Sequence, residues 1–176
     1  MHGVAKMDYP PPAFEQKIHH PAPLADLAAH LQTLPRPLVF TNGVFDVLHR
    51  GHVAYLAQAR AQGASLIVAL NSDASTRRLG KGDDRPINRL EDRAAVIASL
   101  EAVSAVTWFD GDTPLELIRA VRPDVLIKGG DWKPQAIVGA AEVLAWGGTV
   151  HSIPFLHQKS TTALLDAIRK NINKNK

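Results

Sequence analysis

Short apolar runs alternate along the chain with stretches whose apolar residues recur every three or four positions. The runs are bounded by turn residues and predict buried strands at 38–40, 65–70, 105–109, 124–127 and 149–153. The intervening stretches predict helices at 53–60 and 90–100, from 114 onward, at 134–146 and from 160 onward. This alternation predicts an α/β fold: an open parallel sheet of about five strands, with helices on both faces and right-handed crossovers.

The first 20 residues differ from the rest of the chain. They are rich in Pro and His, lack periodicity and include three consecutive prolines at 10–12. Proline excludes regular hydrogen-bonded structure there, so we expect a loose N-terminal leader over 1–20. Residues 21–176 are expected to form a single domain, beginning with a short helix within 21–34.

Composition narrows the function classes. Of the 176 residues, 45% are hydrophobic and 21% are charged, as in ordinary globular proteins. No apolar run of about 18 residues predicts a membrane span, and the N-terminus lacks a signal-peptide core. Cysteine is absent, which excludes disulfides and thiolate chemistry. We expect a cytoplasmic protein. The net charge of +3 comes without a dense basic stripe, so we expect no nucleic-acid partner, although the mild excess favours anionic substrates.

Residues 41–52 connect the first predicted strand to a helix. Such turns lie at the carboxyl edge of a parallel sheet, where open α/β folds bind ligands. His49 and His52 stand three residues apart, with Gly51 between them. A helix N-terminus, a glycine that admits close backbone approach and two imidazoles suit a polyphosphate. Two alternatives stay open: polar surface residues, or a metal pair with Asp46 as third ligand.

These residues carry a family resemblance. His49-Arg50-Gly51-His52 fits the H-x-G-H motif of the nucleotidyltransferase superfamily, and Thr41-Asn42-Gly43-Val44-Phe45-Asp46 resembles the first turn of heptose-1-phosphate adenylyltransferases. The resemblance extends over about 38–170 and implies a Rossmann-like sheet. Further matching stretches follow in the same order: 71–73, 85–88, 90–93, 113–118, 122–124, 128–131 and 160–162. No G-x-G-x-x-G follows the first strand, which disfavours a dinucleotide-binding domain.

The resemblance implies that ATP and D-glycero-D-manno-heptose 1-phosphate react to give ADP-heptose and pyrophosphate, with Mg²⁺ as cofactor. The implied catalytic residues are His49, His52, Lys81 and Lys128. The implied nucleotide-binding residues are Thr41, Asn42, Gly43, Phe45, Gly51, Arg93, Gly129, Asp131, Ser160, Thr161 and Thr162. The implied substrate-binding residues are Asp46, Asn71 and Arg85, and no residue is assigned as a metal ligand.

Several of these residues keep a second interpretation. Asp46 is either an orienter of His or Lys, or an acceptor beside Mg²⁺. Arg93 could instead pair with a neighbouring carboxylate, Lys81 could be solvated, and Ser160 could only cap its helix. The ring of Trp132 either stacks on the base or covers the glycine turn before it.

Rival functions remain at this point: a cytidylyltransferase acting on glycerol 3-phosphate, a non-catalytic nucleotide-binding module, and a His-His-Asp metallohydrolase. Asn42 and residues 128–131 favour the heptose type, and the two histidines with Lys128 favour an enzyme. Family members often carry a sugar-kinase domain ahead of this one, for which the chain is too short. The resemblance therefore implies a separate heptose kinase upstream, and also a homodimer.

Overall fold

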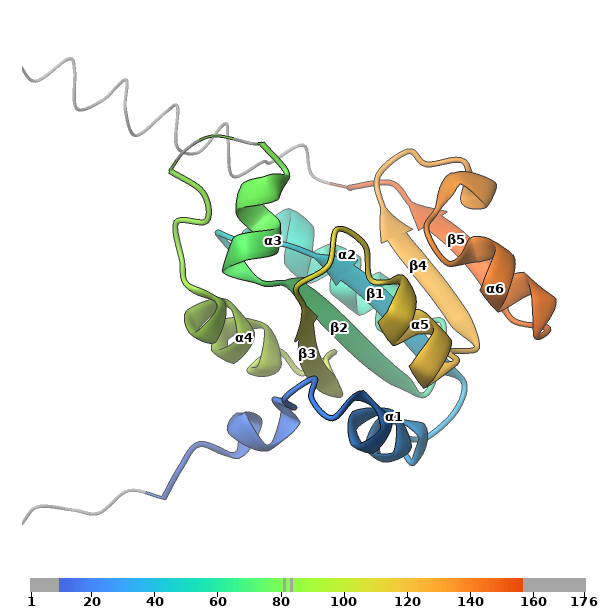
Figure 1. Ribbon diagram of the computed structural model, residues 1–176, viewed down its shortest axis with the longest axis horizontal. Helices are drawn as coiled ribbons and strands as arrows, with labels where there is room; N and C mark the ends of the chain where they lie inside the picture. Colours follow the sequence, from blue (N-terminus) through green and yellow to red (C-terminus); the bar gives the residue numbers. More distant parts are fainter. Residues whose placement is uncertain (1–9, 81, 83, 157–176) are drawn as a thin grey trace, which may run out of the picture.

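The sheet positions every other element (Figure 1). The computed structural model describes residues 10–80, 82 and 84–156. Five parallel strands lie in the order β3-β2-β1-β4-β5. Their bounds are β1 Leu38–Gly43, β2 Ser65–Asn71, β3 Ala105–Phe109, β4 Val125–Gly129 and β5 Thr149–Ile153. This confirms the predicted α/β class. The chain order reverses between β1 and β4, so the crevice at their carboxyl ends is the expected ligand site.

Helices cover both faces of the sheet, as expected for a parallel sheet. They are α1 Leu24–Gln32, α2 Arg50–Arg60, α3 Asp73–Arg78, α4 Leu90–Ala98, α5 Leu115–Val121 and α6 Ala140–Ala145, with 3₁₀ turns η1 Ala13–Lys17 and η2 Pro134–Ala136. No helix in the described part of the chain has the length and apolar character needed to cross a membrane.

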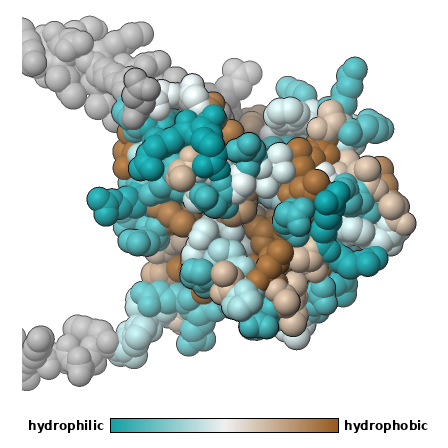
Figure 2. Space-filling model, viewed as in Figure 1, coloured by the Kyte–Doolittle hydropathy of each residue, from teal (hydrophilic) through white to brown (hydrophobic). Residues whose placement is uncertain are grey.

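The core has two halves because strand side chains alternate between faces. In β1, Leu38 and Phe40 pack with α1, α5 and α6, whereas Val39 packs with α2 and α4. All three side chains are fully buried. Burial on both faces explains why β1 to β4 contain continuous apolar runs, whereas the edge strand β5 is partly exposed and mixes polar with apolar residues. Figure 2 shows polar side chains over much of one face of the molecule, with apolar groups between them.

The structure differs from the expectation of a loose segment up to residue 20. Residues 13–17 form η1, and Ile18 makes a parallel bridge with Val106 on the outer edge of β3. The His19 amide donates to the Val106 carbonyl at 2.8 Å, and Phe14 and Ile18 pack against the core. An edge strand presents unpaired backbone groups that another segment can cover. A single bridge has no periodicity, so the sequence pattern could not reveal it.

The predicted helix over 134–146 is interrupted. It consists of η2 and α6, separated by Gly139 with a left-handed φ of 87°. A Cβ atom at this glycine would lie 2.7 Å from Ile118 Cδ1. Both the backbone conformation and the close packing on α5 therefore require glycine here.

We predict that Gly139→Ala is more destabilising than Gly147→Ala. Both glycines have nearly the same φ, 87° and 86°, but a Cβ at Gly147 meets nothing within 4 Å. Left-handed strain alone should lower the free energy of unfolding by about 1–2 kcal/mol in Gly147→Ala. Overpacking against Ile118 should add about 1–3 kcal/mol in Gly139→Ala. Urea unfolding of both variants measures the difference, and equal losses would contradict the packing argument.

Candidate active site

A cavity of about 480 Å³ opens at the carboxyl ends of the central strands. Seven residues predicted from the sequence line it: Asn42, Gly43, Phe45, His52, Asn71, Lys128 and Gly129. They come from the end of β1 and the turn after it, the first turn of α2, and the ends of β2 and β4. The cavity therefore lies at the switch point of the sheet, and its lining combines an ammonium, an imidazole and two amides.

Other predicted residues lie beside or below this cavity. Thr41 is buried, with its Oγ1 2.5 Å from the hydroxyl of Tyr55, so it links β1 to α2 beneath the floor. Gly51 is buried in the first turn of α2, and Asp131 is exposed beyond the glycine turn that follows β4. Lys81, Ser160, Thr161 and Thr162 lie outside the described residues.

The two histidines are held by the start of α2. His49 is the N-cap residue, with an extended backbone, and its Nδ1 accepts the His52 amide at 3.4 Å. The rings stack with centroids 3.7 Å apart and planes 17° apart. The Phe45 ring lies edge-on to His52 at 5.2 Å. These contacts leave His52 facing the cavity, with His49 behind it as the cap.

His52 is held neutral. Burial disfavours its cation and His49 adds like-charge repulsion, which together lower the pKa of His52 to about 4 despite an opposing backbone contact at Val47. Burial also lowers the pKa of His49. The Nδ1 atom of His52 is buried and has no hydrogen-bond partner among residues 10–80, 82 and 84–156. A neutral imidazole can donate one N–H to a phosphate oxygen, and a bound polyanion would raise its pKa again.

Lys128 supplies positive charge at the switch point. Its Nζ lies 3.2 Å from Asn42 Oδ1 and 3.3 Å from the Asn42 carbonyl, so the ammonium bridges the ends of β4 and β1. The next residue, Gly129, has no room for a side chain, because a Cβ would lie 2.7 Å from Phe155 Cζ and 3.2 Å from Tyr55. The backbone after Lys128 is thus packed closely between two aromatic rings.

Asp46 anchors the loop at 85–88, and its two sequence interpretations stay predictions. Its carboxylate accepts from Arg85 Nη1 at 2.6 Å and from the amides of Ile87 and Asn88 at 3.0 and 2.9 Å. Burial alone would raise the pKa of Asp46, but the two amides and the Arg85 guanidinium outweigh it and hold the pKa below the ordinary value. The predicted substrate contacts of Asp46 and Arg85 stay predictions; the geometry gives this pair an anchoring role.

Arg93 occupies the centre of this framework. Its side chain has no exposed surface. The guanidinium donates to the carbonyls of Asn88, Val44 and Asn71 at 2.8–3.0 Å and to Asp73 Oδ1 at 2.7 Å. Arg93 pairs with none of its neighbours in α4, and the geometry favours a positioning role over the predicted nucleotide contact. Its spacing of four residues from the buried Ile97 is the sequence signal that could have indicated an inward orientation.

Several cavity residues were not assigned to the site from the sequence, although Val44, Thr113 and Pro114 belong to matching stretches and Trp132 was considered as a stacking ring. Tyr55 follows Gly51 by one helical turn and so faces the same side, which the sequence could have indicated. Apart from Val44, which lies within the turn after β1, the remaining lining comes from segments distant in the chain, namely Leu79, Asp112, Thr113, Pro114, Trp132, Ala136, Ile137, Val138 and Phe155. Their convergence depends on the order of the strands, which periodicity does not give.

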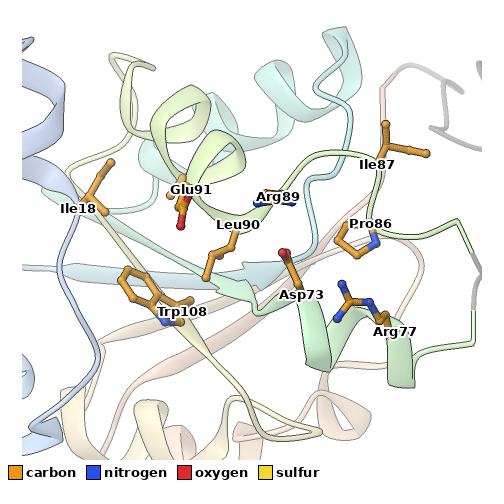
Figure 3. A pocket seen from close by; sticks show the side chains of 10 residues that line it. Ile18, Asp73, Arg77, Pro86, Ile87, Arg89, Leu90, Glu91 and Trp108 are labelled. Atoms are coloured by element: carbon orange, nitrogen blue, oxygen red, sulfur yellow. The ribbon is translucent and has the colours of Figure 1, made fainter.

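A larger hollow of about 770 Å³ lies elsewhere, between η1, α3, α4 and β3 (Figure 3). Trp108, Ile18 and Leu90 form its apolar side, and Arg77, Arg89, Asp73 and Glu91 provide charge. No residue predicted for catalysis or binding lines it. The smaller cavity therefore combines the groups that phosphate chemistry requires, although it is not the largest opening.

Comparison with known proteins shows the family of this chain. Residues 40–167 match the cytidylyltransferase-like family. The chain belongs to this family. It is 56% identical over 157 residues to D-β-D-heptose 1-phosphate adenylyltransferase of Bordetella bronchiseptica, covering 89% of this chain and 96% of that protein. The nucleotidyltransferase resemblance read from the H-x-G-H motif is thus confirmed.

Two further relatives of this cytidylyltransferase-like chain differ in length. The Bifunctional protein HldE of Hahella chejuensis is 52% identical over 84% of this chain, which spans 30% of that protein's length. Among solved structures, the lipopolysaccharide core biosynthesis protein of Thermoplasma volcanium superposes with a TM-score of 0.57 at 28% identity. That match covers 69% of this chain and 98% of the Thermoplasma protein.

We predict that His52 titrates near pH 4 in the free protein and at higher pH with nucleotide bound. The folded pKa of about 4 lies below the ordinary 6.5. The unfolded chain therefore binds more protons between these values, and His52 lowers stability as pH falls through that window. NMR titration of the imidazole signals, assigned with His52→Gln, measures both states. A free-state pKa near 6.5 would contradict the burial argument.

We predict that Arg93→Lys lowers the free energy of unfolding by about 2–4 kcal/mol, because an ammonium cannot reach four acceptors arranged around a planar fork. Arg77→Lys, an exposed change on α3, is the matched control and should cost under about 0.5 kcal/mol. Urea unfolding of both variants provides the comparison. Equal stability of the two variants would show that the buried guanidinium is dispensable.

Proposed function

We propose that the protein transfers the adenylyl group of ATP to D-β-D-heptose 1-phosphate, giving ADP-heptose and pyrophosphate. The observation that carries this is the meeting of His52, Lys128 and Asn42 around one cavity at the switch point of the sheet. The substrates follow from the Bordetella relative, whose similarity extends over nearly the full length of both chains. Its name also suggests the β anomer, which the sequence left open.

The reaction is a displacement at phosphorus. An oxygen of the sugar phosphate attacks the α-phosphorus of ATP, a new P–O bond forms, and the bond to the β-phosphate oxygen breaks to release pyrophosphate. Both reactants are polyanions, so the protein contributes positioning and charge neutralisation. In this proposal His52 donates to a phosphate oxygen as negative charge builds, and Lys128 neutralises charge beside it. The N-terminus of α2 adds the partial positive charge of a helix start.

Mg²⁺ is part of the proposal as the ion that accompanies ATP and screens its phosphates. The donor set of the site fits an ion held by phosphate oxygens and water, because the Asp46 carboxylate is engaged by Arg85 and two amides. The part of the chain that the structure describes contains no group of three His, Asp or Glu side chains placed to hold a metal. We propose that phosphate oxygens and water supply most of the ligands to the ion.

The geometry of the site bears differently on the three rival functions. The metallohydrolase required Asp46 as a third ligand, but its oxygens face the 85–88 loop, and the two imidazoles stack rather than converge. A cytidylyltransferase keeps the same chemistry and differs in the base, so it has to be separated by experiment. A non-catalytic nucleotide-binding module would show no turnover at all, so the activity assay separates it from an enzyme.

The proposal also covers the source of the substrate, the assembly of the protein and the use of the product. A separate kinase would supply the heptose 1-phosphate, since this reaction consumes a sugar already phosphorylated at C1. We propose a cytoplasmic homodimer, as the family resemblance implies. The product, an activated heptose, would serve lipopolysaccharide or capsule assembly.

Pyrophosphate release with heptose 1-phosphate and Mg²⁺ tests the proposal, with ATP, CTP and GTP assayed in parallel. We expect turnover with ATP and the β anomer. Turnover with CTP alone would show that the nucleotide donor is CTP and that the protein is a cytidylyltransferase. Absence of pyrophosphate release with all three nucleotides would reject the proposal that the protein is an enzyme of this kind.

His52→Ala is the variant that connects the assay to the site. Loss of a transition-state donor should lower kcat roughly 10²–10³-fold. His151→Ala is the matched control, because His151 is an exposed histidine on β5 whose imidazole contacts Thr149. Near-normal turnover of His52→Ala, with His151→Ala equally active, would remove His52 from the mechanism.

A further inference from the structure

The active-site cavity has two ends of different chemistry. Its middle is polar, where Asn42, His52 and Lys128 meet. Towards β2 and β3 the lining includes Asn71, Asp112 and Thr113, which offer amide, carboxylate and hydroxyl groups. Towards β4 and β5 it ends in Trp132 and Phe155. The two substrates of a transfer reaction must approach the middle from different sides, so the two ends differ in what they can bind.

The two aromatic side chains at the β4 and β5 end of the cavity, Trp132 and Phe155, are unusually exposed; this part of the cavity is called the aromatic end. Trp132 keeps 51% of its surface accessible and Phe155 keeps 44%, although both are large apolar side chains. Scattered apolar residues on a surface are ordinary, but two aromatic rings at the end of one polar cavity form a local patch. Such patches mark binding sites for flat or apolar groups.

The ring of Trp132 is held in place. Its backbone amide donates to Ser152 Oγ at 3.0 Å, and its indole Nε1 donates to the Gly129 carbonyl at 3.1 Å. A Cβ at Gly130, which has φ of 111°, would lie 3.2 Å from the indole nitrogen. The indole is therefore tethered by its polar edge to the turn that directly follows Lys128. Since the N–H is already bonded, the ring has only its apolar surface to offer a ligand.

Phe155 supports the same end from the neighbouring strand connection. Its ring packs on Gly129 and lies edge-on to the buried Tyr55, with centroids 5.6 Å apart. Tyr55 in turn contacts Thr41 in β1. The aromatic end is thus built on the floor of the site, so that a ligand bound there is fixed relative to Lys128.

We propose that Trp132 is the stacking platform for the nucleobase, which leaves the triphosphate directed towards Lys128 and His52. This inference rests on the proposed function, in that the cavity must take a nucleoside triphosphate. Every base has a flat π face that an indole can stack on without using its N–H. A heptose presents hydroxyls that need hydrogen-bond partners, and polar side chains line the cavity near β2 and β3. Thr113 is one of them. Asn71 also donates through Nδ2 to Ser75, and Asp112 also accepts through Oδ1 from Arg78.

Two consequences separate this role from a ring that only covers the glycine turn. Stacking contributes affinity for any base, so Trp132 strengthens the binding of ATP and GTP alike and does not select between them. The ring contributes nothing to a ligand that has phosphates but no base. Loss of the ring should therefore weaken nucleotides specifically.

Calorimetric titration of the full chain with ATP and with inorganic tripolyphosphate tests this directly. Trp132→Ala should weaken ATP roughly tenfold. The same variant should leave tripolyphosphate within about twofold, and Trp132→Phe, which keeps a stacking ring, should bind ATP within about threefold of the unaltered chain. Trp146→Phe is the matched control, because it also loses an indole-to-carbonyl bond, to Pro123 at 3.0 Å, on a segment away from the cavity. It should bind both ligands normally.

Indole fluorescence of the folded chain provides a second measurement. ATP should quench the emission and tripolyphosphate should not, and the quenching should vanish in Trp132→Phe but persist in Trp146→Phe.

Each result has a definite meaning. Unchanged ATP binding by Trp132→Ala would overturn the stacking role while leaving the proposed function intact. If Trp132→Ala weakened the binding of ATP and of tripolyphosphate equally, the ring would serve only to shape the glycine turn. That result would also overturn the stacking role. Failure of the unaltered chain to bind ATP or to release pyrophosphate would overturn the proposed function, and the inference with it.

Discussion

The buried guanidinium of Arg93 is the interaction on which the site depends. A charge without exposed surface is tolerated only if it is paired and fully hydrogen-bonded. Here the acceptors come from four segments: the turn after β1 at Val44, the end of β2 at Asn71, the start of α3 at Asp73, and the loop at Asn88. Removing any one segment would leave part of the cation without a partner. Arg93 therefore holds the elements around the cavity in one mutual arrangement.

Asp46 completes this framework from the other side of the same turn. The Asp46 carboxylate accepts hydrogen bonds from residues 85–88, and Arg93 donates to the carbonyl of Asn88 in the same loop. Arg93 also donates to the carbonyl of Val44. The turn between β1 and α2 is therefore fixed at Val44 and at Asp46. Between them lies Phe45, buried and with a left-handed φ of 48°. Such a backbone costs on the order of 1–3 kcal/mol and persists only where its surroundings impose it. This backbone conformation places the Phe45 ring edge-on against the imidazole of His52.

The sequence predicted the five strands and the family because these depend on local signals. A strand buried on both faces is a continuous apolar run, and a motif keeps its spacing. The roles of Asp46 and Arg93 were not predictable in this way, because a motif names residues without naming contacts. The carboxylate partners of Asp46 lie 39 to 42 positions away. The Arg93 partners are scattered from 5 to 49 positions away. The same holds for Ile18 on the edge of β3 and for Gly139, whose requirement comes from Ile118 on another helix. Lys81 and residues 160–162 fall outside the described residues, so their predicted roles stay predictions.

The electrostatics of the cavity follow from the same framework. Two amides and Arg85 satisfy the Asp46 carboxylate, so this buried anion is compensated within the protein rather than left to repel a phosphate. Burial keeps the pKa of His52 low and its imidazole neutral, so the free site does not carry two adjacent imidazolium charges beside Lys128. An entering polyanion reverses this balance, because its charge favours the imidazolium and raises the pKa of His52. In the proposed reaction, positive charge would thus develop in response to the ligand, where negative charge accumulates during phosphoryl-type transfer. A rigid floor makes this possible, because an imidazole free to turn into water would lose the burial that keeps it neutral.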